Sequence, residues 1–123
     1  METVILFDEI NDKVLRLMAD DPLEKPVERP HITVQRNPEI IPRHLFGTPV
    51  IVEITGYGND GENEGLSCRV QSVKPELQEL LDKIFIPHIT LSTKENAKPL
   101  NTRYLEFKEF STPYVCKGFF GGM

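Results

Sequence analysis

Two stretches of the chain, Arg29-Pro-His-Ile-Thr-Val34 and Ile86-Pro-His-Ile-Thr-Leu91, share the four consecutive residues Pro-His-Ile-Thr. Their histidines lie 57 positions apart (88 minus 31), which is close to half of the 123-residue length. Self-similar segments at a long separation are typical of an internal duplication. The pair therefore predicts a chain built from two related halves.

Each copy of this stretch has the alternation of a β-strand. Residues i and i+2 of a strand point to the same face of the sheet. His31 and Thr33 therefore share one face, and His88 and Thr90 share the corresponding face of the second copy. The aliphatic residues between and after them suit burial, so each polar face is expected to present an imidazole beside a hydroxyl.

The segments around the two copies repeat one order of elements. In the first half, a buried apolar strand at 3–7 precedes an amphipathic helix at about 9–20, with Asp8 as its N-cap. In the second half, an alternating strand at 66–73 precedes a helix at about 75–84. Further β runs are expected at 50–55, 104–110 and 113–119, irregular segments at 22–30 and 37–48, and a turn-rich acidic linker at 56–65. This order predicts an α+β fold in which sheet packs on helices.

Composition narrows the class of protein. The chain is 39% hydrophobic and 27% charged, and its length suits one domain, so we expect a single folded unit over residues 1–123. Its net charge of −5 argues against a protein that coats duplex DNA, which needs a broad basic surface. The first residues lack the basic region of a signal peptide, and no apolar run approaches the roughly 20 residues that span a bilayer. We therefore expect a cytoplasmic protein without a membrane partner, with Cys68 and Cys116 as buried free thiols.

Two imidazoles and two hydroxyls in one groove suit phosphodiester cleavage. One neutral histidine can take a proton from the attacking oxygen while the other, protonated, gives one to the leaving oxygen. Imidazole suits both roles because its unperturbed pKa is about 6.5. Threonine hydroxyls can donate hydrogen bonds to the phosphate oxygens. A metal site would need three or four ligands, commonly at close spacings that the chain lacks, so we expect neither metal nor cofactor. His44 has no such context and is expected to be structural or exposed.

His31-Ile-Thr33 and His88-Ile-Thr90 resemble the paired His-x-Thr motifs of the two-histidine phosphoesterase superfamily, which includes 2′-5′ RNA ligase-like proteins and RNA 2′,3′-cyclic phosphodiesterases. The resemblance spans nearly the whole chain. It implies a bilobal fold of duplicated antiparallel sheets related by a pseudo-two-fold axis, with helices on the outer faces and a central cleft. The two lobes would be interleaved and would cover roughly 1–55 and 64–123.

The resemblance also implies hydrolysis of a nucleotide or RNA cyclic phosphate, or of a 2′-linked phosphodiester. It assigns acid–base catalysis to His31 and His88 and phosphate binding to Thr33 and Thr90. The chain is shorter than many members, and some short relatives are phage enzymes that degrade cyclic oligonucleotide signals. The motifs do not distinguish the acid from the base, and they do not select one substrate.

Further residues are candidates for substrate contacts. Ser92 continues the polar face of the second copy, and Arg69 lies on the polar face of its strand. Tyr57 and Tyr114 could stack on a base. Arg36 and Lys94 are further candidate phosphate ligands. We expect a monomer that acts on a nucleotide or an RNA end. Two alternatives are a binding module that holds a nucleotide without cleaving it, and an interaction protein whose acidic loop 59–64 contacts a basic partner.

Overall fold

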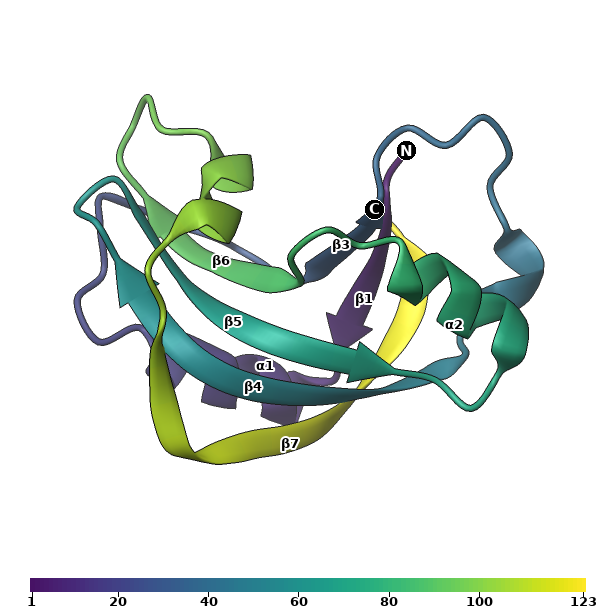
Figure 1. Ribbon diagram of the computed structural model, residues 1–123. Coiled ribbons are helices and arrows are strands. Elements are labelled where there is room, and N and C mark those ends of the chain that lie inside the picture. The colour runs from purple at the N-terminus through teal and green to yellow at the C-terminus, as the bar shows by residue number, and fades with distance from the viewer.

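The computed structural model describes all residues from Met1 to Met123 and has an α+β fold, as the order of elements predicts. Seven strands form one antiparallel sheet in the order β2-β6-β5-β4-β7-β1-β3. The sheet is strongly curled (Figure 1), and its strands β3 and β6 approach each other across the curl. The elements are β1 (Thr3–Phe7), α1 (Glu9–Leu17), β2 (Lys25–Pro26), β3 (Ile32–Gln35), η1 (Arg43–Leu45), β4 (Pro49–Asn59), β5 (Asn63–Gln71), α2 (Pro75–Asp82), β6 (His88–Thr93), η2 (Pro99–Tyr104) and β7 (Lys108–Gly122), where η marks a 3₁₀ helix.

The sheet is continuous because β4 and β7, which pair near its centre, join the strands of the two halves of the chain. β4 pairs with β5 on one side and with β7 on the other. The acidic linker expected at 56–65 is mostly strand, since β4 runs on to Asn59 and β5 begins at Asn63. Gly56 permits this extension, because a Cβ there would lie 2.8 Å from the Lys108 carbonyl oxygen and 2.9 Å from Ser67 Oγ.

The two helices begin where the sequence predicts, and both end earlier than expected. The Asp8 side chain caps α1 by accepting a hydrogen bond from the Asn11 backbone N–H at 2.8 Å. Pro75 is the first residue of α2, where its missing N–H costs no helical hydrogen bond. No helix in the structure is long and apolar enough to cross a membrane.

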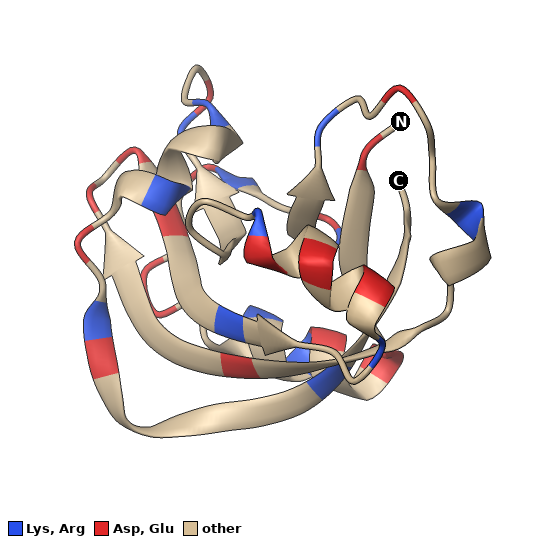
Figure 2. Ribbon diagram, turned by 45° about the vertical axis from the view of Figure 1, so that its right-hand side comes forward, with Lys and Arg blue, Asp and Glu red and all other residues tan.

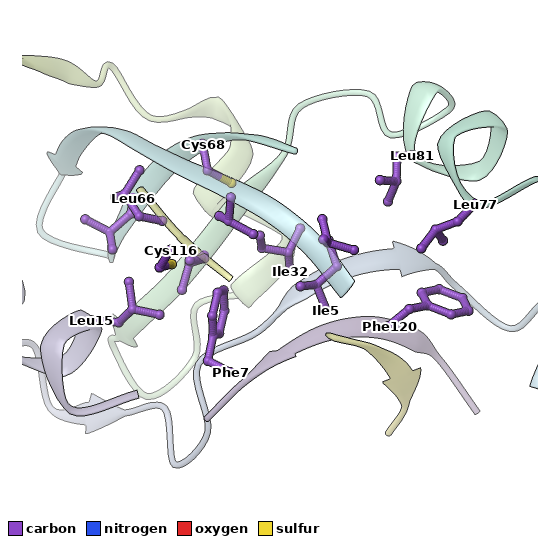
Figure 3. Close-up of a cluster of buried hydrophobic side chains, with 14 of the residues drawn as sticks. Ile5, Phe7, Leu15, Ile32, Leu66, Cys68, Leu77, Leu81, Cys116 and Phe120 are labelled. Atoms are coloured by element: carbon purple, nitrogen blue, oxygen red, sulfur yellow. The ribbon is translucent and has the colours of Figure 1, made fainter. Parts of the chain in front are cut away.

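A single cluster of 16 buried residues forms the hydrophobic core (Figure 3). Ile32 of β3 and Ile89 of β6 belong to it and are fully buried, which confirms that the aliphatic face of each Pro-His-Ile-Thr copy faces inward. Cys68 and Cys116 are free and buried, as expected. Burial raises the pKa of both thiols, that of Cys116 to about 11, so both stay protonated and unreactive near neutral pH.

The C-terminal third differs most from the expected pattern. Pro99 begins the 3₁₀ helix η2, which occupies 99–104 where a strand was expected to start, and β7 is one strand in place of the two expected runs. β7 remains one strand although its register with β4 shifts between Glu109 and Tyr114. The important consequence is that η2 packs against β5 and β6, close to the second histidine strand.

Candidate active site

A cleft of about 490 Å³ lies between β3, β6 and η2, and all four residues of the two His-x-Thr pairs line it. Residues far apart in the sequence meet here because the sheet curls β3 towards β6 (Figure 1). The lining consists of Glu2, Val27, His31, Thr33, Arg36, His88, Thr90, Lys98, Pro99 and Leu100. The i, i+2 alternation therefore predicted which face of each strand these four side chains share, and both faces border this cleft.

The two histidines are anchored in the same way. Nδ1 of His31 lies 2.9 Å from the Arg29 carbonyl oxygen, and Nδ1 of His88 lies 2.8 Å from the Ile86 carbonyl oxygen. A carbonyl oxygen only accepts hydrogen bonds, so Nδ1 donates in both rings. Nε2 of each neutral ring is thus left unprotonated and free to act on a ligand.

The proline before each histidine explains this shared anchor. Proline fixes its own φ and holds the preceding residue in an extended conformation. Arg29 and Ile86 occupy that preceding position, and each supplies the carbonyl that the ring binds. The repeated Pro-His pair thus sets the tautomer and the direction of both rings.

The environment of His88 favours its neutral form. Burial lowers its pKa from the usual value, and the positive charges of Arg36 and Arg103, together with a protonated His31, lower it further. The bond to the Ile86 carbonyl acts in the opposite direction but does not outweigh burial. His88 is therefore suited to accept a proton at neutral pH.

We expect the His88 ring to titrate below about 6.5 in NMR spectra of its ring protons recorded from about pH 5 to 8. Below about pH 6.5 the unfolded chain then binds more protons at this histidine than the folded chain does. The free energy of unfolding therefore falls as the pH drops below about 6.5. The His88→Gln variant assigns the signal and should lose this part of the pH dependence. A midpoint at or above about 6.5 would contradict the proposed effect of burial.

The Thr90 hydroxyl connects strand β6 to η2. Its Oγ1 lies 3.0 Å from the Pro99 carbonyl oxygen and 2.9 Å from Oγ1 of Thr102. Thr102 is fully buried and also accepts a hydrogen bond from the Asn63 side-chain amide at 3.1 Å. These bonds fix the wall of the cleft that Lys98 and Leu100 provide.

Basic residues lie on two sides of the cleft. Arg36, which follows β3, was a candidate phosphate ligand and lines the cleft, where its Nη1 lies 3.2 Å from the Glu2 carboxylate. Lys98, which lines the cleft, and Arg103, which lines an adjoining hollow, were missed, because the segment before 104 showed no periodic pattern. Figure 2 shows Lys and Arg on η2 and on the segment after β3. Their position shortly after the second motif was the only available signal.

Four of the predicted substrate contacts lie outside the cleft. Ser92 is 1% exposed and donates a hydrogen bond to Glu64 at 2.7 Å, because a β-bulge between Thr90 and Ser92 interrupts the alternation of β6. Tyr57 also donates to Glu64. Arg69 pairs with Glu53 at 2.8 Å, and the Tyr114 hydroxyl donates to the Asn11 side chain at 2.8 Å.

Two other candidates also lie away from this cleft. Lys94 lines a different hollow together with Glu62 and Glu95. His44 is exposed and pairs with Glu76 at 2.8 Å, which connects η1 to α2. No group of three or more His, Cys, Asp or Glu side chains in the structure is arranged to hold a metal ion.

Comparisons of the chain with models of known families, with curated proteins and with solved structures found no match. The geometry of the cleft is therefore the basis for assigning a function.

Proposed function

We propose that this protein is a metal-independent phosphodiesterase that cleaves a nucleotide or RNA cyclic phosphate, or a 2′-linked phosphodiester. The observation that carries the proposal is the pair of equally anchored imidazoles, His31 and His88, with free Nε2 atoms in one cleft beside two threonines. General acid–base catalysis needs one proton acceptor and one proton donor within reach of the same phosphate.

In the proposed reaction, neutral His88 takes a proton from a water molecule whose oxygen forms a bond to phosphorus. Protonated His31 gives a proton to the ribose oxygen as its bond to phosphorus breaks, so a cyclic phosphate becomes a monoester. We assign the base to His88 because burial lowers its pKa. The Thr33 hydroxyl and the charged groups of Arg36 and Lys98, which line the cleft, would stabilise the phosphate oxygens. Thr90 would join them once its hydroxyl turns from the Pro99 carbonyl to the phosphate.

We also propose that the fold is a duplication with two lobes related by a pseudo-two-fold axis and helices on the outer faces. The strand order supports this. Each histidine strand pairs with the strand that precedes its helix, β3 with β1 and β6 with β5. Each of those strands then pairs with one of the two central strands, β1 with β7 and β5 with β4. The series β3-β1-β7 thus mirrors β6-β5-β4.

We further propose a cytoplasmic monomer whose partner is its nucleotide or RNA-end substrate. The cleft supports this, because one chain supplies both histidines and both threonines. The net charge of −5 fits a local phosphate site better than a surface that binds long nucleic acid.

The proposal is tested by incubating the purified protein in EDTA with 2′,3′-cyclic nucleotides, a short RNA with a 2′,3′-cyclic end, and cyclic oligonucleotides. We expect turnover of at least one substrate to survive EDTA and to vanish in the His31→Ala/His88→Ala double variant. Loss of turnover in EDTA that zinc or manganese restores would indicate a metal enzyme instead. Ligands that bind and stay intact would indicate a binding module.

A further inference from the structure

A second hollow of about 280 Å³ adjoins the catalytic cleft on the side of α2. The two share Thr33, Arg36, His88 and Leu100 as lining residues, so a ligand can extend from one into the other. The rest of the second hollow consists of Val34, Lys83, Ile84, Phe85, Ile86 and Arg103. Ile86 holds the His88 ring through its carbonyl and Arg103 helps to lower the pKa of His88, but the Phe85 side chain has no role in the proposed acid–base chemistry.

Phe85 is an unusual wall residue because its side chain is 71% exposed. It lies in the short connection between α2 and β6, three residues before His88, and it is not part of the hydrophobic core. Leaving a phenylalanine in water forgoes the free energy that burial would provide. An exposed ring next to a cleft is therefore available to a ligand.

Arg103 lies beside this ring and has unused hydrogen-bonding capacity. Its guanidinium carbon is 5.6 Å from the centroid of Phe85 and 4.8 Å from that of Tyr104. Nη2 donates to the Tyr104 hydroxyl at 2.8 Å, which steadies the guanidinium plane. Nε is buried and has no hydrogen-bond partner. A buried donor without a partner is rare in proteins and indicates a group that a ligand or water satisfies.

We infer that this hollow is a nucleobase subsite, in which the Phe85 ring and the Arg103 guanidinium contact the base of a nucleotide whose phosphate lies between the histidines. The inference rests on the proposed function for the identity of that phosphate. Aromatic rings and guanidinium planes both stack on bases, and such stacking is tolerant of base identity.

The position of the subsite also defines the class of substrate. The catalytic cleft itself is lined by no Phe, Tyr or Trp, and Val27, Lys98 and Pro99 line it without lining the second hollow. A single stacking surface beside the phosphate fits a substrate of which the protein binds only one nucleobase. A nucleoside 2′,3′-cyclic phosphate or an RNA 3′ end has that form, whereas a cyclic dinucleotide would present a second base to a wall without a stacking partner.

The first test compares two substrates, adenosine 2′,3′-cyclic phosphate and the base-free methyl riboside 2′,3′-cyclic phosphate. In the wild type, kcat/KM should favour the nucleotide. Phe85→Leu, which keeps an apolar side chain without the ring, should lower this preference about tenfold or more, mainly through KM. The control Val73→Ala changes a residue that is 95% exposed and lines neither hollow, and it should keep the preference. An unchanged preference in Phe85→Leu would overturn the subsite.

A second measurement separates failure of the subsite from failure of the proposed function. Calorimetry of adenosine 3′-monophosphate and ribose 3-phosphate binding needs no turnover. Weaker binding of the nucleotide alone in Phe85→Leu supports the subsite, even for a protein that cleaves nothing. Equal weakening of both ligands, or of neither, would overturn the subsite while leaving the two-histidine reaction intact. If Arg103→Gln also weakened binding of the nucleotide alone, the Arg103 guanidinium would be assigned to the nucleobase subsite as well.

Discussion

Replacing either cleft histidine with alanine is expected to lower the rate of phosphodiester cleavage at least about a hundredfold. In the proposed mechanism His31 and His88 each carry out one of the two proton transfers. The carbonyls of Arg29 and Ile86 hold the two rings separately, so we expect neither to replace the other. Both side chains are only partly buried, so their truncation should leave the melting temperature close to that of the wild type. The measurements are kcat and kcat/KM at the pH optimum, with a thermal melt of each variant.

His44→Ala is the matched control, because it removes the third imidazole of the chain from an exposed pair with Glu76. Its activity should equal that of the wild type. The wild type should also show a bell-shaped dependence of rate on pH, since it needs one neutral and one protonated histidine. A single His31→Ala or His88→Ala variant that keeps full activity would rule out the two-histidine mechanism.

Glu64→Ala is expected to have the largest effect on stability, a loss of about 3–5 kcal/mol in the free energy of unfolding, since each donor left unpaired costs about 1–3 kcal/mol. Glu64 is fully buried, and its carboxyl oxygens accept hydrogen bonds from Ser92, Tyr57 and the Asp21 backbone N–H. These donors come from three separate parts of the chain. Removing the carboxyl group leaves the hydroxyls of Ser92, which is buried, and of Tyr57, which is partly buried, without their acceptor, and the Asp21 N–H keeps only its longer bond to the Tyr57 hydroxyl. Donors left unpaired in this way cost more than the hydrogen bonds themselves. Urea denaturation measures the loss.

Three further variants show whether the expected loss in Glu64→Ala comes from its buried hydrogen bonds. Tyr57→Phe and Ser92→Ala each remove one donor and should cost about 1–2 kcal/mol. Glu62→Ala removes an exposed carboxylate two residues away and should stay within about 0.5 kcal/mol of the wild type. If Glu64→Ala proved as mild as Glu62→Ala, the buried network would not be holding these segments together.

Local patterns predicted the parts of the molecule that local physics determines. The strand Thr3–Phe7 is a continuous apolar run and has the expected bounds. The faces of His31, Thr33, His88 and Thr90 follow from the two-residue period of a strand. In both cases, neighbouring residues alone carry the information.

Features that depend on distant contacts were not predictable in this way. Glu64 lies in a segment that resembles a solvated acidic hairpin, and only the contacts from Asp21, Tyr57 and Ser92 bury it. Ser92 leaves the cleft face because of a bulge, which depends on the pairing of β6 with β5. The role of Lys98 in the cleft wall likewise depends on the packing of η2 against β6.

The equal anchoring of the two imidazoles has a consequence for the product. A phosphate between them meets the same kind of nitrogen from either side, so the chemistry alone does not dictate which way round a ribose enters. Two differences between the sides of the cleft would select the orientation of the ribose. One is the burial that lowers the pKa of His88, and the other is the Phe85 ring, which lines the same hollow as His88. In the proposed reaction, the ratio of 2′- to 3′-monophosphate released from one cyclic nucleotide would then report how unequal the surroundings of the two imidazoles are.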